Sequence, residues 1–320
     1  MGSPLLRSNR GRSARSAGVR IVTRVLVALL VCASLVAFAI ALASTWEEAV
    51  ERGLPTAPVL IGVVVLTCGA VVCGAHAWAV LVGASARRSD LTRSYYVSQL
   101  AKYIPGGIWQ PAGQIAVTNR AGVPVRRATG LVVLFMVLIA TAALPFALFV
   151  AIAGETLPAV VRLGLGASVL GLALVRPGVL RAVVAFVGRR VTKAAESVDL
   201  PPGGAIDRSS LLLFCHHLVQ GLAFAIVLRA FDTDVNWVLA VAAFPVAWLA
   251  GFLALPVPSG IGVREAALVG LLHGAAPAEA VLAAGVVHRL ANVLAEGIDL
   301  GGNQLRSTLR RQRAQGPSSA

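Results

Sequence analysis

Polar and charged side chains lie along one face of a long apolar run near the C-terminal end of the chain. Four of them are spaced by four, four and three residues, the spacing of one helical face: His288, Asn292, Glu296 and Asp299. Arg289 borders this face. A charge at the centre of a membrane helix costs about 2.5–3.5 kcal/mol, so such residues are retained for pairing or function. The pattern predicts either a hydrophilic groove in which an arginine holds a phosphate, or an Arg–Glu pair that locks two helices together.

A second candidate anion site lies at Arg264 and Glu265, just after Gly260-Ile261-Gly262, where a helix is expected to begin. Helix N-termini attract anions, so an arginine in the first turn needs an anion or Glu265 as its partner. The guanidinium fork matches phosphate oxygens two at a time. We therefore expect Arg264 and Arg289 to hold a lipid phosphate, with Glu265 or Glu296 as the counter-charge.

Two short segments break the apolar pattern in a similar way. Residues 102–110 read KYIPGGIWQ, and residues 256–265 read PVPSGIGVRE. Irregular backbone at membrane depth survives only where it is buried in protein or lines a wet cavity. Paired, interrupted segments of this kind indicate a transport site. The sequence therefore predicts two re-entrant tips that meet inside a helix bundle. The alternative is two cytoplasmic loops, in which Trp109 and Tyr103 are interface aromatics.

The side chains beside these breaks supply the predicted lining of a lipid path. Lys102 and Arg264 would attract an anionic headgroup, while Gln110, Gln114 and Trp109 line the path and the lipid tails stay in the bilayer. Another polar group, His216-His217 with Gln220, lies in a separate apolar run. Adjacent histidines point about 100° apart on a helix, which favours interhelical hydrogen bonds over a shared metal ion.

The composition identifies the class of protein. Hydrophobic residues make up 57% of the 320 positions and charged residues 13%, against roughly 25% charged residues in soluble domains. The net charge of +14 comes from arginines between the apolar runs and at the termini, as the positive-inside rule predicts, and does not indicate nucleic-acid binding. The four cysteines lie in apolar runs without metal-ligand spacing, so no metal or cofactor is expected.

The order of the apolar runs predicts an all-α, polytopic membrane bundle with about 7–8 transmembrane helices. Broken, re-entrant segments are expected at 95–118 and 256–272, and an interfacial helix near 178–193. If residues 178–188 instead cross the membrane, the orientation of the second half inverts. The predicted spans are 21–43, 58–82, 131–153, 157–175, 209–228, 237–255, a shorter helix at 262–272, and 278–300.

The predicted organisation is one transmembrane domain between two basic tails. Residues 1–20 are expected to be a disordered cytoplasmic tail, 21–300 the single membrane domain, and 301–320 a second cytoplasmic tail. Because both tails are rich in arginine, both termini are placed on the cytoplasmic side of the cell membrane.

The two broken segments resemble the signature segments of a known family. KYIPGGIWQPAGQ, followed far downstream by PVPSGIGVREAALVGLL, is similar to the paired motifs of the lysylphosphatidylglycerol synthase transmembrane-region family, also called flippase-like domains. The resemblance covers nearly the whole chain, and the second motif is the more specific. The residues that match are Tyr103, Pro105, Gly106, Gly107, Trp109 and Gln110 in the first motif, and Pro258, Gly260, Gly262, Arg264 and Glu265 in the second.

The resemblance implies a multi-spanning protein with re-entrant elements that moves or handles anionic phospholipids or polyprenyl-linked sugars. The bifunctional synthases carry a large soluble aminoacyl-transfer domain, whereas this chain ends in a short basic tail. It is therefore not expected to make aminoacylated lipid by itself. Its implied partners are membrane lipids and, in a second reading, a glycosyltransferase or lipid-modifying enzyme that it would scaffold without transporting anything.

Catalysis is the weaker expectation. An intramembrane transferase or phosphatase would need a nucleophile or base near the phosphate, and the local candidates are Ser259, His288 and Glu265. Their spacing matches no catalytic motif, so the chain is not expected to be an enzyme. No Walker motif is present to use ATP directly. Small-solute transport is the last alternative.

Overall fold

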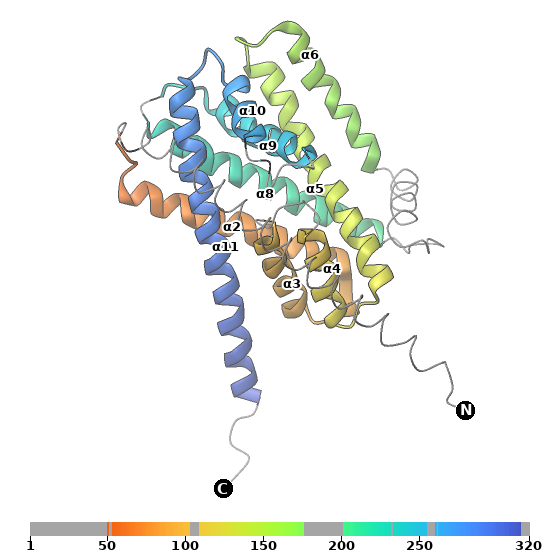
Figure 1. Cartoon of the computed structure of the whole chain (residues 1–320). Helices are drawn as coiled ribbons and strands as arrows, with labels where there is room; N and C mark the ends of the chain where they lie inside the picture. The colour runs from red at the N-terminus through yellow and green to blue at the C-terminus, as the bar shows by residue number, and fades with distance from the viewer. Residues whose placement is uncertain are drawn as a thin grey trace, which may run out of the picture.

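The computed structural model describes residues 50, 53–102, 109–175, 201–231, 233–254, 260 and 262–314. Every regular element in this part of the chain is helical, as predicted. In this part of the chain, four helices are long and apolar enough to cross a membrane: α2 (Ala57–Val82), α5 (Val125–Ala153), α8 (Gly203–Arg229) and α11 (Ala278–Ala314). Two shorter apolar helices accompany them: α6 (Ala159–Ser168), which is followed by a 3-10 segment (Val169–Val175), and α9 (Trp237–Leu253). The fold is that of a polytopic helical membrane protein (Figure 1).

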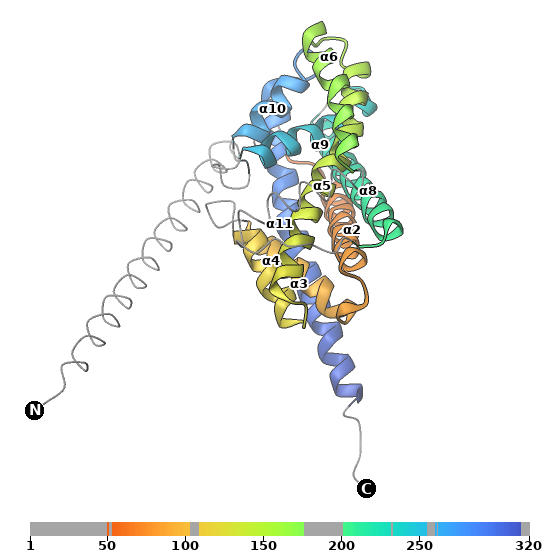
Figure 2. The same ribbon diagram turned by 90° about the vertical axis from the view of Figure 1, so that its right-hand side faces the viewer.

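Several helices extend beyond the apolar runs from which they were predicted. Helix α5 begins at Val125 rather than at residue 131. The helix can continue through Arg126 and Arg127 because their charged side chains can lie in water, outside the hydrocarbon. Helix α11 continues past residue 300 and has 37 residues, or about 55 Å of helix against ~30 Å of hydrocarbon. Its C-terminal part projects beyond the other helices (Figures 1 and 2). The predictions for 1–20, 21–43 and 178–193 lie outside the described residues.

Helices α2 and α8 pack antiparallel along their length. Ser209, near the start of α8, donates a hydrogen bond to the carbonyl of Ala77, near the end of α2, at 3.2 Å. Asn303, in the late part of α11, donates a hydrogen bond to the hydroxyl of Thr92 at 3.2 Å. Thr92 lies in α3 (Arg88–Ala101), the helix that comes after α2 in the chain. The end of α2, the start of α8 and the late part of α11 therefore lie toward the same end of the bundle.

The two adjacent histidines of α8 bond to two different helices, as predicted. His216 Nδ1 donates to the carbonyl of Ala70 in α2 at 2.7 Å, and His217 Nε2 donates to the carbonyl of Ile139 in α5 at 2.9 Å. Both rings are buried. These bonds fix α8 between α2 and α5 by polar contacts that hydrocarbon cannot replace.

Helix α8 also approaches α9 closely one turn before Pro245, a proline inside α9. Proline has no N–H to donate to the carbonyl four residues earlier, which is that of Val241. Gly221 of α8 lies against this carbonyl oxygen, and a Cβ at position 221 would collide with it. The glycine thus permits the crossing that brings α8 and α9 together.

Two pairs of shorter helices flank the breaks in the chain. Helices α3 (Arg88–Ala101) and α4 (Trp109–Arg120) lie side by side around the first break, and α9 and α10 (Val263–Leu271) around the second (Figures 1 and 2). Helices α3, α4 and α10 are roughly 13–21 Å long, too short to cross ~30 Å of hydrocarbon. The motif residues between the helices lie outside the described residues, so their re-entrant path stays a prediction: Tyr103, Pro105, Gly106, Gly107 and Pro258.

Two clusters of buried apolar side chains hold the bundle together. One joins α8, α9, α10 and α11 and contains Phe224 and Phe244. The other joins α2, α3 and α5 and contains Trp78 and Phe135, whose rings meet edge to face at 5.6 Å. Side chains of both clusters contribute to the wall of one cavity, which therefore lies between them.

Candidate functional site

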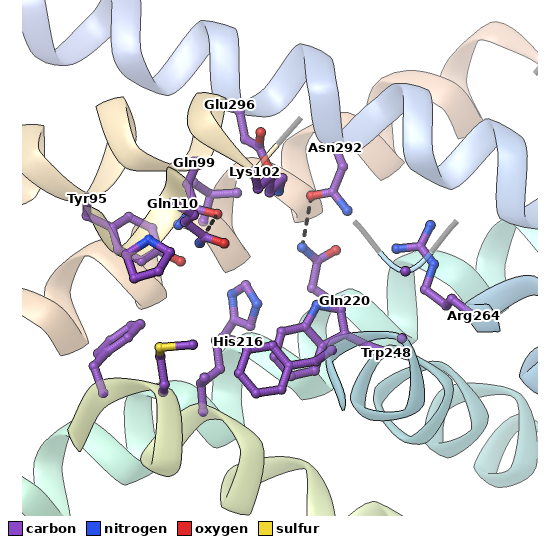
Figure 3. Close-up of a pocket in the computed structure, with 18 of the residues that line it drawn as sticks. Tyr95, Gln99, Lys102, Gln110, His216, Gln220, Trp248, Arg264, Asn292 and Glu296 are labelled. Atoms are coloured by element: carbon purple, nitrogen blue, oxygen red, sulfur yellow. Dashed lines mark hydrogen bonds and ion pairs between the residues drawn. The ribbon is translucent and has the colours of Figure 1, made fainter. Parts of the chain in front are cut away.

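A cavity of about 190 Å³ lies between the two pairs of short helices. Its charged and carboxamide side chains come from α3 and the residue after it, and from α4, α8, α10 and α11: Gln99, Lys102, Gln110, Gln114, Gln220, Arg264, Arg289, Asn292 and Glu296. Its apolar wall comes mainly from α5 and α9: Val132, Phe135, Met136, Ile139, Phe244, Trp248 and Phe252. Figure 3 shows Gln99, Lys102 and Glu296 gathered on one side, with Trp248 on the other. The cavity is therefore amphipathic.

The first ion pair of the cavity joins Lys102 and Glu296. Lys102 follows the last residue of α3, and its ammonium donates a hydrogen bond to Oε1 of Glu296 on α11. The side chain of Glu296 is 2% exposed and that of Lys102 26% exposed. A carboxylate this deeply buried is tolerated because a cation accompanies it. The pair ties the first broken segment to the polar face of α11.

The second ionic group joins α10 to α11. Arg289 Nη2 donates to Glu265 Oε1 at 2.8 Å, and Arg264 Nε lies 3.6 Å from the same oxygen. The other oxygen of Glu265 accepts a hydrogen bond from the N–H of Gly262 at 2.8 Å, which caps the start of α10. Glu265 is thus the partner of Arg264, one of the two partners predicted for it from the sequence. The predicted Arg–Glu pair that locks two helices together is formed by Arg289 and Glu265.

Arg264 reaches the cavity over an aromatic ring. Arg264 is 8% exposed, and its Cζ atom lies 5.3 Å from the centre of the Phe244 ring. Around the cavity, three cations (Lys102, Arg264 and Arg289) face two carboxylates (Glu265 and Glu296), a surplus of one positive charge. This balance favours a ligand with one negative charge, and guanidinium groups bind phosphate oxygens in charge-assisted pairs.

The turn that carries Arg264 depends on a close glycine contact. Gly260 has φ +64°, and a Cβ added there would lie 2.6 Å from the Cα of Gly251 in α9. Both glycines line the cavity. Glycine at 260 satisfies the backbone angle and the close approach together, so Gly260 can lie directly against the end of α9.

The structure brings together many of the predicted site residues, but not all. Those that line the cavity are Lys102, Gln110, Gln114, Gly260, Arg264, Arg289, Asn292 and Glu296. Glu265 and Gly262 lie beside it, in the cap of α10. Trp109 begins α4 without lining the cavity. His288 is fully buried with its ring 4.3 Å from that of Phe244, so it packs in the core instead of lining the groove.

Several residues that line the cavity were not predicted to lie on the lipid path. Tyr95, Gln99 and Trp248 were not singled out, and His216 and Gln220 were interpreted only as structural. Two local signals were present. Gln99 lies three residues before Lys102, and Gln220 lies four residues after His216, so each shares a helical face with a residue already identified.

Comparison with known proteins agrees with this architecture. The model of the family described as "Lysylphosphatidylglycerol synthase TM region" matches residues 21–295, a range that contains both broken segments. No curated protein matches the chain in a sequence comparison. The resemblance of the two motifs is thereby confirmed over most of the chain. With its spanning helices and two interrupted segments, this multi-pass membrane protein belongs to the lysylphosphatidylglycerol synthase transmembrane-region family.

Proposed function

We propose that the protein translocates an anionic phospholipid or a polyprenyl-linked glycolipid across the cell membrane, with the headgroup passing through the cavity. The family is one of membrane proteins related to lipid handling, which supports a lipid as the substrate. The observation that carries the proposal is the amphipathic cavity between the two helix pairs, α3 with α4 and α9 with α10. A polar wall suits a headgroup, and an apolar wall suits the first methylenes of a lipid tail.

The ionic groups have the composition that phosphate binding requires. A phosphate that enters the cavity meets Arg264, Arg289 and Lys102, each of which lies beside a carboxylate. The phosphate competes with Glu265 and Glu296 for these cations, so binding exchanges one set of charge-assisted hydrogen bonds for another. This exchange lowers the cost of bringing a charged headgroup to membrane depth, which is several kcal/mol for an unpaired charge.

Leaflet exchange in vesicles tests the proposal. Purified full-length protein is reconstituted with fluorescent anionic phospholipids or a labelled polyprenyl phosphate lipid, and the rate of exchange is followed by quenching from outside. We expect wild type to accelerate exchange, and Arg264→Ala and Arg289→Ala each to lower the rate at least tenfold. Arg126→Ala, an exposed arginine at the start of α5, serves as the matched control and should retain the wild-type rate.

A folded wild type that exchanges none of these lipids would contradict the proposal. The protein would then be better described as a scaffold for an envelope glycosyltransferase or lipid-modifying enzyme, and affinity purification from the native membrane would be the next step. Exchange that is unaffected by either arginine substitution would instead place the lipid path outside this cavity.

A further inference from the structure

Five carboxamide side chains line the same cavity. They come from four helices: Gln99 on α3, Gln110 and Gln114 on α4, Gln220 on α8 and Asn292 on α11. A carboxamide at membrane depth must be hydrogen-bonded or it destabilises the fold. A phosphate site needs cations and does not need this many neutral amides. These five amides therefore indicate a ligand that has further polar groups besides its phosphate.

The amides satisfy one another only in part. Gln110 Nε2 donates to Gln99 Oε1 at 3.4 Å, and Gln220 Nε2 donates to Asn292 Oδ1 at 3.0 Å. Gln114 and Gln220 are 3% and 4% exposed. Among the described residues, Gln114 Nε2 and Gln220 Oε1 have no hydrogen-bond partner. Buried polar atoms without a partner indicate positions at which a bound ligand supplies the missing hydrogen bond.

The unsatisfied atoms select the chemistry of that ligand. Gln114 Nε2 needs an acceptor, whereas Gln220 Oε1 and the second oxygen of Glu296, also without a partner in the described chain, need donors. A phosphodiester offers acceptors alone and an ammonium offers donors alone. A hydroxyl is both donor and acceptor. A headgroup with several hydroxyls therefore satisfies both kinds of atom.

The apolar wall favours a ring over an open chain of hydroxyls. Trp248 and Phe252 both line the cavity, and their rings stack at 5.1 Å with an interplanar angle of 14°. Figure 3 shows Trp248 next to Gln220, on the side opposite Lys102 and Glu296. The C–H face of a sugar ring packs on a flat aromatic surface, while its hydroxyls reach amide groups beside it.

We propose that the headgroup recognised in this cavity is a sugar joined to its lipid through phosphate. The proposal rests on the translocation function above and narrows its substrate class. Arg264 and Arg289 bind the phosphate, the Gln220–Asn292 pair and Gln114 bind hydroxyls, and Trp248 supports the ring. A glycerol headgroup or an aminoacyl headgroup leaves part of this set unused.

Equilibrium binding to purified full-length protein, measured by native mass spectrometry, tests the proposal. The lipids compared are a polyprenyl phosphate carrying one hexose, the bare polyprenyl phosphate, phosphatidylglycerol and lysylphosphatidylglycerol. We expect the glycosylated lipid to bind at least tenfold more tightly than the others. Gln220→Met and Gln114→Met should each lower that preference roughly three- to tenfold, the value of a lost neutral hydrogen bond. Gln304→Met, an exposed amide on α11, should not change it.

Equal or tighter binding of the bare, glycerol or aminoacyl lipid would overturn the sugar proposal, as would loss of affinity for all four lipids alike in both variants. Because α4 and α8 carry the two substitutions, a folding defect in one variant leaves the other informative. Leaflet exchange by the same preparation separates the two proposals. Exchange without sugar preference removes only the inference about the headgroup, and sugar preference without exchange removes only translocation.

Discussion

At the scale of single residues, Glu296 is the group on which the polar wall depends. Its side chain is almost fully buried, and it is paired with a lysine that keeps some contact with solvent. The two partners are therefore not equivalent. Removing the lysine leaves a buried carboxylate without a cation, whereas removing the carboxylate leaves an ammonium whose flexible stem can reach water.

A double-mutant cycle tests this asymmetry. We expect Lys102→Met to lower the free energy of unfolding by about 2–3 kcal/mol, a value reduced from that of fully buried pairs because Lys102 is partly exposed. Glu296→Gln should cost about 1 kcal/mol, and the double variant should cost less than the sum of the two. Denaturant titration in detergent micelles measures all three. Strict additivity would show that the two side chains do not interact in the native protein.

Residue spacing predicted much of the cavity and misplaced some side chains, His288 among them. Arg289, Asn292 and Glu296 do face the cavity. His288 does not, because each four-residue step turns about 40° beyond a full turn, so a stripe at this spacing winds around the helix. The start of the stripe consequently faces the aromatic core of α8 and α9. Trp248 could not be identified in advance, because nothing in its local sequence distinguishes a cavity wall from a lipid-facing surface.

At the scale of elements, the second broken segment is held by the contact between Gly251 and Gly260. The backbone at Gly260 has a positive φ, and the two glycine backbones leave no room for a side chain between them. This contact sets the start of α10, and with it the positions of Arg264 and Glu265.

Alanine substitution at two glycines distinguishes the effect of this contact on stability from the effect of helix propensity. Gly260→Ala should destabilise the protein by about 2–3 kcal/mol, since it combines backbone strain with a steric clash. Gly270→Ala, at an open position of α10 with nothing within 4 Å, should be neutral or stabilise it by up to ~1 kcal/mol. Thermal unfolding in detergent provides the comparison. Equal stability of the two variants would argue against a close crossing at Gly260.

Helix positions were predictable because hydrophobicity and length decide which segments can span a membrane. The apolar runs predicted α2, α5, α8, α9 and α11 with few errors. Their ends were less predictable, since helices such as α5 and α11 continue into the basic flanks when water accepts the side chains. The close crossing of α8 and α9 was not predictable either, because it depends on Gly221 facing a carbonyl freed by Pro245, two residues that are distant in sequence.

At the scale of the whole molecule, charge is distributed unevenly between the two ends of the bundle. Arg88, Arg126 and Arg208 lie at helix ends on the side where α2 finishes and α8 starts. At the opposite end, Thr156 after α5 donates a hydrogen bond to the carbonyl of His273 before α11, at 2.7 Å. Among the described residues, carboxylates lie at this end on Glu155, Asp234 and Glu279. The arginines found there are each held by a neighbour: Arg229 at the end of α8 pairs with Asp234 at 3.5 Å, and Arg162 donates a hydrogen bond to the carbonyl of Ala151 at 2.7 Å.

This distribution predicts the orientation in the membrane. The arginine-rich end should face the cytoplasm, together with the C-terminal part of α11. In a chain whose four cysteines are replaced by alanine, Glu155→Cys should react with a membrane-impermeant thiol reagent in intact cells. Arg126→Cys should react only after permeabilisation. Labelling in the reverse pattern would invert the proposed orientation of the helices.

The central claim is that the lipid headgroup passes through the cavity, and reversible blocking of the cavity tests it most directly. In the cysteine-free protein, Met136→Cys on the cavity wall and Leu163→Cys on the exposed face of α6 are each modified with a bulky methanethiosulfonate reagent. We predict that modification at 136 stops lipid exchange in vesicles, that a reducing agent restores it, and that modification at 163 leaves the rate unchanged. An unchanged exchange rate after complete modification at 136 would contradict the account.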